Sequence, residues 1–339
     1  MPNVTYNTLD PLFETIGLIS VSRNVDETRR ETVKALDELG FDGEKFYATH
    51  MSAFDCYVQE FCKHYTPGAN DALFFDDSGA GLLLLLMCLL FENRELIASV
   101  DGFDDSEINA EIMELCCDLY DLKLAKNIDG LDGLMAFVDA CVLTESEKWK
   151  LLRIMKSPKA HIKQMISTIN TNMPAFEKAK SKVRVPLEKL ISQYAEAMED
   201  GGAGMFGKFR KSLSETADIY PSLAFPVSQL IFSNSCYYGL MSTLLIRQEG
   251  PDQEQLLRRL KALSDGSRLE ILRSIRKKPK YNLEIADQLG LTAATMSHHM
   301  SVLLTCGFVG VNKQDSRVYY HLEEDAVRQF IGSLEQLLV

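Results

Sequence analysis

The feature that most constrains the fold lies near the C-terminus, where short helical segments are separated by turn residues. Residues 282–289 carry apolar side chains at helical spacing, and Gly290 ends this segment. Thr292 can cap a second helix, which continues to about Thr305. Two short helices joined by a glycine-containing turn are typical of a helix-turn-helix.

The residues after this helix pair predict a β-hairpin. Val309 and Val311 alternate with small or polar neighbours, and residues 312–317 form a polar tip. Alternation of apolar and polar residues then resumes over residues 318–322. A hairpin that follows a helix-turn-helix is a wing. We therefore expect residues 251–339 to form a winged helix-turn-helix domain.

Helices are also predicted on both sides of this motif. Residues 252–264 form a first helix, and a second helix opens with Ser267 and Glu270 as a capping pair. The last helix, residues 323–337, has a continuous apolar stripe made of Val327, Phe330, Ile331, Leu334 and Leu338. So small a domain leaves this stripe little to cover. We expect the first and last helices to form a homodimer surface; alternatively, both pack on the N-terminal region.

Upstream of a break near Gly250 and Pro251, nearly every segment has a helical pattern. Residues 26–39 end at Gly40, and residues 106–126 and 187–198 have apolar stripes at three- and four-residue steps. The fold class is therefore predicted to be mainly α, with a large all-helical N-terminal domain over residues 1–250 before the winged helix. Whether this domain divides into two near residue 157 stays open.

Three other segments of this region carry structural predictions. The apolar run over residues 82–91 is shorter than the roughly 20 residues of a membrane span, so we expect a buried helix and no membrane association. Tyr220 to Pro226 is predicted to be extended or turn, because proline resists helix. Aromatic residues at helical spacing are predicted to be core rather than a ligand pocket: Phe54, Tyr57, Phe61 and Tyr65.

Charge is distributed unevenly along the chain. The 339 residues carry a net charge of −12, yet residues 251–339 hold 12 basic and 11 acidic side chains. The N-terminal part is therefore strongly acidic, and a polyanion is repelled by it and attracted to the other end. The eight cysteines lack regular spacing, which is typical of a reduced, cytoplasmic chain.

Four motifs in the C-terminal region resemble the ArsR family of bacterial transcriptional regulators. They are residues 262–272 (ALSDGSRLEIL), 295–303 (TMSHHMSVL), 307–309 (GFV) and 317–320 (RVYY). The resemblance covers about the last 88 residues. It implies a homodimeric winged helix-turn-helix protein that binds double-stranded operator DNA and usually represses transcription.

The rotation of the helix over residues 292–305 predicts which side chains contact DNA. Met296, Met300 and Leu303 share one face, which we expect to be core. The opposite face and the N-terminal end approach the base edges in this motif. The candidates on this helix are Thr292, Ala293, Ala294, Thr295, Ser297, His298 and Ser301. His299 lies nearer the core boundary and is expected to support the helix.

The predicted wing and the preceding helix supply further contacts. Lys313, Arg317 and Tyr319 suit the DNA backbone or the minor groove. Additional phosphate contacts are possible for a second basic set, which is otherwise a solvated helix face: Arg268, Arg273, Arg276, Lys277 and Lys278.

No metal site is predicted. The helix over residues 281–290 lacks the cysteine-containing motif of the family's metal sensors, and the last helix has no histidine or cysteine. Cys116 and Cys117 are either small buried hydrophobes or a pair that binds a soft ion or oxidises. A metal- or redox-responsive sensor using N-terminal cysteines is therefore an alternative. Otherwise the N-terminal region is expected to bind a small-molecule or protein effector.

Two glycine motifs raise the possibility of an enzyme. Residues 202–207 fit G-x-G-x-x-G, but they follow a helix rather than a strand. Residues 77–81 resemble the first motif of class I methyltransferases, although Leu83 stands where a third glycine is expected. We predict a non-enzymatic regulator without catalytic residues or cofactor; a methyltransferase-like enzyme with an appended DNA-binding domain is the alternative.

Overall fold

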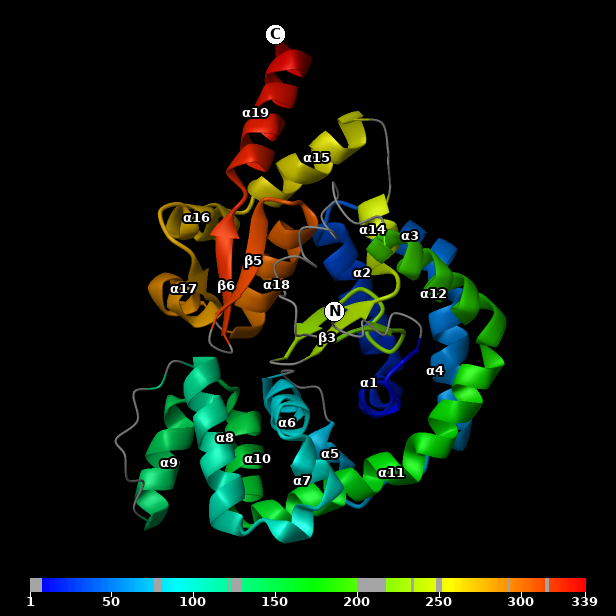
Figure 1. Ribbon diagram of the computed structural model, residues 1–339, viewed down its shortest axis with the longest axis vertical. Helices are drawn as coiled ribbons and strands as arrows, with labels where there is room; N and C mark the ends of the chain where they lie inside the picture. The colour runs from blue at the N-terminus through cyan, green and yellow to red at the C-terminus, as the bar shows by residue number, and fades with distance from the viewer. Residues whose placement is uncertain are drawn as a thin grey trace.

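The computed structural model describes residues 8–75, 81–120, 122, 130–199, 218–232, 235–247, 252–291, 293–314 and 317–339. Helices dominate, and most of those before residue 200 form a broad arc around a small central sheet (Figure 1). The C-terminal domain lies at the open side of this arc. The mainly α fold class predicted from the sequence is confirmed.

The helices of the arc follow one another with short connections. In chain order they are α1 (Pro11–Arg23), α2 (Val25–Glu38), α3 (Gly43–His50), α4 (Ser52–His64), α5 (Asp71–Phe74), α6 (Gly81–Glu92), α7 (Arg94–Ala98), the 3-10 helix η1 (Val100–Gly102), α8 (Asp105–Tyr120), α9 (Gly130–Ala140), α10 (Glu145–Lys156), α11 (Pro158–Lys182) and α12 (Arg184–Glu199).

Two helices are buried on nearly all sides because their sequences are apolar around the whole helix. In α1 every residue from Leu12 to Val21 is buried, and Asp10 caps the helix by accepting from the backbone N–H of Leu12 and Phe13. Helix α6 contains the long apolar run and is buried from Leu82 to Phe91 except at two positions. The prediction of a buried helix there is confirmed.

Other sequence predictions for the arc also hold. Helix α2 is followed by Gly40, whose φ of 88° is the left-handed conformation that glycine adopts most easily. Phe54, Tyr57 and Phe61 are core residues of α4, each no more than 2% exposed. Helix α8 ends at Tyr120, and residues 121 and 123–126 of the longer predicted helix lie outside the described residues.

The prediction of an all-helical N-terminal domain is wrong, because this region contains a three-stranded sheet. Strands β1 (Asp218–Ser222), β2 (Gln229–Ile231) and β3 (Ser235–Gly239) are arranged in the order β1-β3-β2. Strand β1 pairs with β3 in parallel, and β2 pairs with β3 antiparallel. All five residues of the central strand β3 are buried, so its sequence lacks the alternation that identifies a half-exposed strand. The predicted extended segment from Tyr220 does enter the sheet.

A buried carboxylate joins this sheet to the centre of the arc. Glu14 of α1 is fully buried and accepts hydrogen bonds from Tyr57 Oη at 2.9 Å and Ser222 Oγ at 2.6 Å. The backbone N–H groups of Leu223 and Ala224, just after β1, also donate to it at 3.1 Å. Burial raises the pKa of the Glu14 carboxyl from 4.5 to about 7, although each of these donors lowers it.

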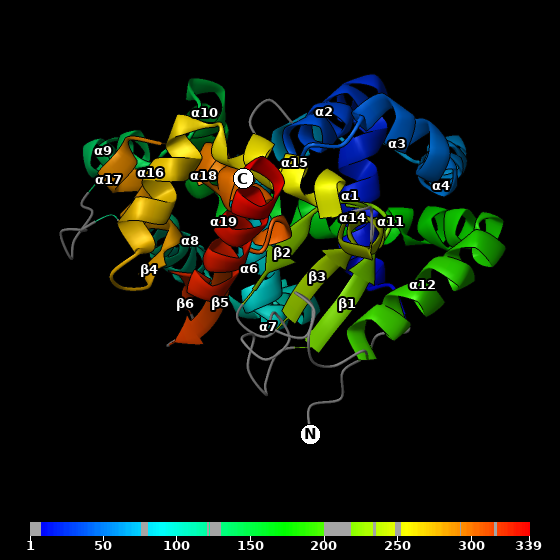
Figure 2. The same cartoon turned by 90° about the horizontal axis from the view of Figure 1, so that it is seen from above.

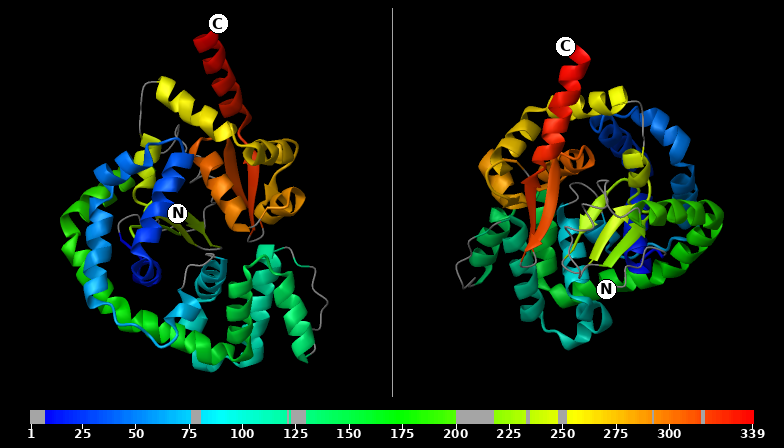
Figure 3. Two further views of the ribbon diagram at one scale, coloured as in Figure 1. Left: turned by 180° about the vertical axis from the view of Figure 1, so that it is seen from behind. Right: turned by 45° about the horizontal axis from the view of Figure 1, so that its top comes forward.

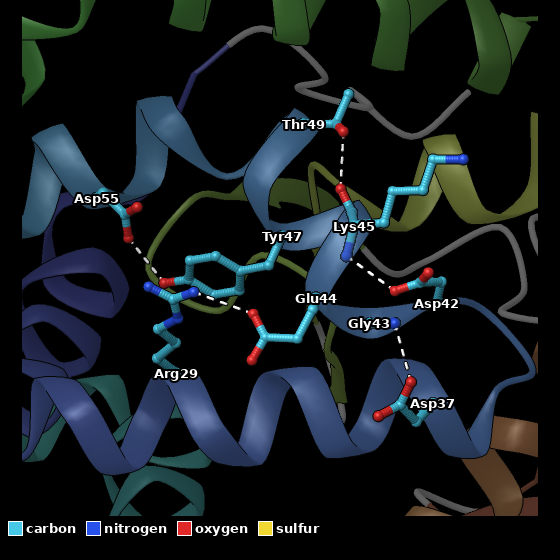
Figure 4. Close-up of polar contacts among 9 residues, drawn as sticks. All are labelled: Arg29, Asp37, Asp42, Gly43, Glu44, Lys45, Tyr47, Thr49 and Asp55. Carbon is cyan, nitrogen blue, oxygen red and sulfur yellow. Dashed lines mark hydrogen bonds and ion pairs between the residues drawn. The ribbon is translucent and has the colours of Figure 1, made fainter.

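The corner between α2 and α3 is braced by polar contacts (Figure 4). The Arg29 guanidinium lies 4.8 Å from the centre of the Tyr47 ring and pairs with Glu44 at 3.0 Å. Tyr47 Oη in turn donates to Asp55 of α4 at 2.7 Å. These contacts fix the direction of α3 against its neighbours.

The C-terminal domain has its own small sheet, separate from the first (Figure 2). After α14 (Ser242–Arg247), its elements are α15 (Asp252–Leu263), α16 (Gly266–Ile275), β4 (Lys280–Tyr281), α17 (Asn282–Leu289), α18 (Ala293–Thr305), β5 (Val309–Gln314), β6 (Arg317–Leu322) and α19 (Glu324–Leu338). Gly250 and Pro251 lie outside the described residues, so the domain limits at residues 157 and 250 stay predictions. None of the described helices has the length and apolar character needed to cross a bilayer.

Candidate nucleic-acid interface

Helices α17 and α18 form the predicted helix-turn-helix. Helix α17 ends before Gly290, which has a φ of 65°. Helix α18 ends where Gly307, with a φ of 72°, turns the chain so that the N–H of Phe308 donates to the carbonyl of Leu303 at 3.0 Å. The chain then enters β5 directly. The winged helix-turn-helix predicted from the sequence is confirmed.

The buried face of α18 is the one that the sequence predicted. Met296, Met300 and Leu303 are each no more than 2% exposed. Val302 and Leu304 are also buried, so the helix is covered on more of its circumference than its rotation alone indicates. The side chain of Thr295 is exposed and that of Ser301 is half-buried, which agrees with the predicted outward face.

The remaining DNA-contact candidates on this helix stay predictions. Thr292 lies outside the described residues. The backbone of Ala293, Ala294, Ser297 and His298 lies in the first two turns of α18. This end of a recognition helix approaches the base edges in helix-turn-helix proteins.

Helix α18 lies on the side of its domain that is turned toward α1 and α2, whereas α16 and α17 lie on the far side (Figures 1 and 3). DNA that reaches this helix must therefore come near the N-terminal arc.

The wing consists of β5 and β6, which pair antiparallel from Val309 opposite Leu322 to Gln314 opposite Arg317. Lys313 and Arg317 are therefore both placed at the tip end of the hairpin. Tyr319 is half-buried, and its ring packs edge-on against Tyr281 at 5.8 Å. Tyr281 belongs to β4, a two-residue strand that pairs with β6 and that the sequence did not reveal, because so short a strand has no pattern.

The N-terminal end of α16 corrects one predicted cap. Asp265, not Ser267, caps the helix by accepting from the N–H of Arg268 at 3.0 Å. Burial opposes ionisation of Asp265, but the N–H of Arg268 and the charges of Arg268 and His299 outweigh it, and the pKa of the carboxyl is lowered. His299 is 9% exposed, which agrees with its expected place near the core boundary.

Several of the basic side chains are used inside the domain. Arg268 is 6% exposed and lies 3.8 Å from the Asp265 carboxylate, so the predicted phosphate contact of Arg268 is wrong. Arg259 Nε donates to the carbonyl of Cys306 at 3.1 Å. Arg273 is exposed and pairs with Glu270 at 2.6 Å.

Exposed charge remains in the turn after α16. The residues Arg276, Lys277 and Lys278 are all exposed. They are the members of the second basic set that are free to face a phosphate backbone.

Cys306, the cysteine of this domain, has an unreactive thiol. Burial raises the pKa of the Cys306 thiol to about 11, so the thiol stays protonated near neutral pH. Within the described parts of the chain, no group of three or more His, Cys, Asp or Glu side chains is placed to hold a metal ion.

An apolar face of α15 and α19 is open to solvent. Phe330 of α19 packs edge-on against Phe308 at 5.4 Å, but Ile331, one residue further, is 57% exposed. On α15, Leu256 is buried while Leu257 is 58% exposed. Helix α19 projects away from the rest of the molecule (Figure 1), so it does not pack on the N-terminal region as the alternative prediction required.

The sequence comparisons agree with this geometry. The family described as "Bacterial regulatory protein, arsR family" matches residues 265–311. The HTH-type transcriptional regulator CmtR of Mycobacterium bovis is 33% identical over 88 residues, which are 26% of this chain and 75% of that protein. The chain belongs to the ArsR family.

Other relatives share the same region. CmtR of Mycobacterium tuberculosis matches with the same identity and coverage. An uncharacterized HTH-type transcriptional regulator, MJ1325 of Methanocaldococcus jannaschii, is 30% identical over 78 residues, which are 23% of this chain and 88% of that protein. No solved structure matches the chain.

The two glycine motifs do not form a described nucleotide site. Residues 202–207 lie outside the described residues, as do residues 77–80 of the other motif. The methyltransferase motif requires a preceding strand, and the structure has helix α5 there.

Helix α15 contacts the N-terminal region, as the alternative prediction held for this helix, although the sequence did not identify the residues that make the contact. The Arg258 guanidinium of α15 is 4.7 Å from the centre of the Phe41 ring, in the corner between α2 and α3. Arg258 is only 7% exposed, and a Cβ at Gly40 would lie 2.9 Å from its side chain. Phe41 and Arg258 are more than 200 positions apart, and no local sequence pattern in either segment predicts that they meet.

Proposed function

We propose that the protein is a homodimeric, sequence-specific DNA-binding transcriptional regulator that represses from an inverted-repeat operator. The observation that carries this proposal is the family's winged helix-turn-helix, with recognition helix α18 and a paired wing. Because its target is chromosomal operator DNA, such a regulator works in the bacterial cytoplasm.

Each part of the winged helix-turn-helix has a distinct role in this proposal. Ser297 and His298, at the N-terminal end of α18, read base edges in the major groove, and the small Ala293 and Ala294 allow the backbone to approach. Lys313 and Arg317 at the wing tip contact the phosphate backbone or the minor groove, which positions the protein without specifying sequence.

The exposed apolar face of α15 and α19 supports the homodimer. Burying Leu257 and Ile331 against the same face of a second copy removes apolar surface from water and forms a two-fold interface. Two recognition helices held in this way fit half-sites about 10 bp apart, centre to centre.

In this proposal the N-terminal arc modulates DNA binding. Its Phe41 touches Arg258 on α15, the same helix that carries the exposed Leu257. An effector that moves the α2–α3 corner therefore moves a helix of the dimer interface and changes the separation of the two recognition helices. The acidic arc lies near α18 and further lowers its affinity for DNA.

Selection of genomic fragments by the purified full-length protein, followed by a salt titration on the selected fragment, tests this function. Arg317→Ala is expected to weaken binding to every sequence and to reduce the salt dependence by about one ion per monomer. His298→Ala is expected to relax base preference at one position instead. Arg328→Ala, an exposed change on α19 outside α18 and the wing, is the matched control.

If the wild-type protein selects no duplex even at low salt, the proposal is wrong. A selected duplex with an unchanged salt slope for Arg317→Ala would instead remove the wing from the interface. The methyltransferase alternative predicts methyl transfer from S-adenosylmethionine to the selected duplex, which we expect to be absent.

A further inference from the structure

A polar groove lies between the C-terminal ends of α4 and α11 on the N-terminal arc. Its volume is about 500 Å³, and sites for small molecules usually measure about 300–1,000 Å³. The side chains that line it come from both helices: Glu60 and His64 of α4, and Glu177, Lys178, Ser181 and Lys182 of α11. None of these residues has a role in the proposed function.

Three of the lining residues share one face of α11. Lys178, Ser181 and Lys182 are at positions i, i+3 and i+4, which are neighbours on the surface of a helix. Each of them is exposed. The spacing therefore places two ammonium groups and one hydroxyl beside one another along the groove, and all three are hydrogen-bond donors.

The two carboxylates of the groove are already paired with lysines that do not line it. Lys63 Nζ lies 2.7 Å from Glu60 Oε2, and Lys180 Nζ lies 2.8 Å from Glu177 Oε2. Lys180 Nζ also lies over the Phe176 ring, 5.0 Å from its centre. The hydrogen bond from Lys63 lowers the pKa of Glu60, so this carboxylate stays ionised beside its own lysine. The negative charges of the groove are therefore compensated from outside it.

The two lysines of the groove have no such carboxylate. Lys178 Nζ lies 3.5 Å from His64 Nδ1. The other ring nitrogen, Nε2, lies 3.3 Å from Glu60 Oε1, and a neutral ring that donates there has its lone pair on Nδ1, facing Lys178. Lys182 forms no ion pair with another residue in the described part of the chain. The groove therefore carries two positive charges that the protein does not neutralise.

A phosphate monoester matches this arrangement of charges and donors. It carries nearly two negative charges near neutral pH and has three strong acceptor oxygens. Lys178 and Lys182 supply two positive charges, and the Ser181 hydroxyl supplies a third donor. Lysine binds phosphate as a point charge, whereas a planar carboxylate is matched best by the fork of an arginine, which the lining of this groove lacks.

Helix α4 connects the groove to the corner that touches the C-terminal domain. Its last two turns carry Glu60 and His64, and its first turn carries Asp55, which accepts from Tyr47 Oη of α3 at 2.7 Å (Figure 4). The same corner contacts Arg258 of α15. A ligand that bridges α4 and α11 therefore restrains the helix that positions this corner.

We propose that the groove binds a small metabolite that carries a phosphate monoester, and that this ligand is the effector of the N-terminal arc. The phosphate oxygens accept from Lys178, Ser181 and Lys182, and the rest of the molecule occupies the volume toward α4. The effector role rests on the proposed function, whereas binding of the ligand does not require that the protein bind DNA.

Isothermal titration calorimetry on the full-length protein, in dilute buffer near neutral pH, tests the binding. The probes are inorganic phosphate and glycerol phosphate; glycerol lacks the phosphate, and succinate is a dianion with carboxylates instead. We expect both phosphates to bind, with an affinity that falls as salt is added because exposed charges are screened, and glycerol not to bind. Absence of binding by both phosphates, or tighter binding of succinate, would overturn the proposal.

Variants test whether the groove is the site. Lys178→Gln and Lys182→Gln are each expected to weaken binding of glycerol phosphate about 3- to 5-fold, and the double variant about 10- to 25-fold. Ser181→Glu places a carboxylate in the groove and is expected to abolish binding. All three positions are exposed, so the variants should fold, and circular dichroism checks this.

A matched control makes the same charge change outside the groove. Lys163→Gln combined with Lys189→Gln alters two exposed lysines, one on α11 and one on α12, and is expected to leave the affinity for glycerol phosphate unchanged. An equal loss of affinity in this control would overturn the proposal. So would a loss caused by Lys277→Gln with Lys278→Gln, because the phosphate would then bind at the C-terminal domain.

Fluorescence anisotropy with the duplex that the protein selects tests the effector role. Saturating glycerol phosphate is expected to change the DNA affinity of wild type by about 5-fold or more and to leave that of the double variant Lys178→Gln/Lys182→Gln unchanged. No change in wild type, or an equal change in the double variant, would overturn the effector role. A protein that selects no duplex would refute the proposed function instead, and calorimetry would still decide whether the groove binds phosphate.

Discussion

Replacing Glu14 by glutamine tests how the buried carboxyl affects stability. The pKa of this group is about 7 in the native protein and 4.5 as its ordinary value. Between these values the native carboxyl retains a proton that the unfolded chain has released. The native state therefore loses stability as the pH rises from about 4.5 to about 7 and changes little above that.

The magnitude follows from the same two values. One pH unit corresponds to about 1.4 kcal/mol, so ionisation of Glu14 is expected to lower the free energy of unfolding by about 3 kcal/mol across this interval. Glutamine does not titrate and lacks this pH dependence. It also places an NH₂ group against donors that now face a carboxylate oxygen, which lowers stability at every pH by about 1–3 kcal/mol.

Urea unfolding of wild type and Glu14→Gln at several pH values between 4.5 and 8.5 measures both effects. Circular dichroism follows the transition, because helices dominate the described structure. The stability advantage of wild type should shrink by about 3 kcal/mol toward high pH. Glu111→Gln, an exposed change on α8, is the control. A wild-type advantage that is constant over the whole range would show that Glu14 does not cause the pH dependence.

Two further substitutions test the contact of Phe41 with Arg258 and the exposed apolar face of α15 and α19. Phe41→Ala removes the ring beneath Arg258, a contact of about 0.5–2 kcal/mol. The acidic arc then loosens from the winged helix domain, and DNA affinity is expected to rise about 3- to 10-fold. Unchanged affinity in a fluorescence anisotropy titration would show that the contact of Phe41 with Arg258 does not affect DNA binding. Ile331→Asp places a charge on the exposed face of α19 and is expected to convert dimer to monomer in sedimentation, whereas Arg328→Ala leaves the dimer intact; a dimeric Ile331→Asp would move the interface elsewhere.

Much of the winged helix-turn-helix was predictable because it depends on local sequence patterns. Gly290 and Gly307 end helices, the rotation of α18 separates Met296 and Met300 from the outward face, and alternating residues predict the wing. Asp265 shows the limit of this approach, because Ser267 is an equally good capping residue by type. Backbone geometry, not composition, decides which residue precedes the first turn of α16.

Local patterns of residues were enough to predict the mainly helical class, the winged helix and the face of α18 that packs inward, since periodicity and turn chemistry act within a few residues. The central sheet, the burial of Glu14 and Arg268, and the contact of Phe41 with Arg258 became apparent only in the folded protein. These features join segments far apart in the chain. Their free energy comes from desolvation and direct contact between the partners, and neither quantity is present in a local pattern of residues.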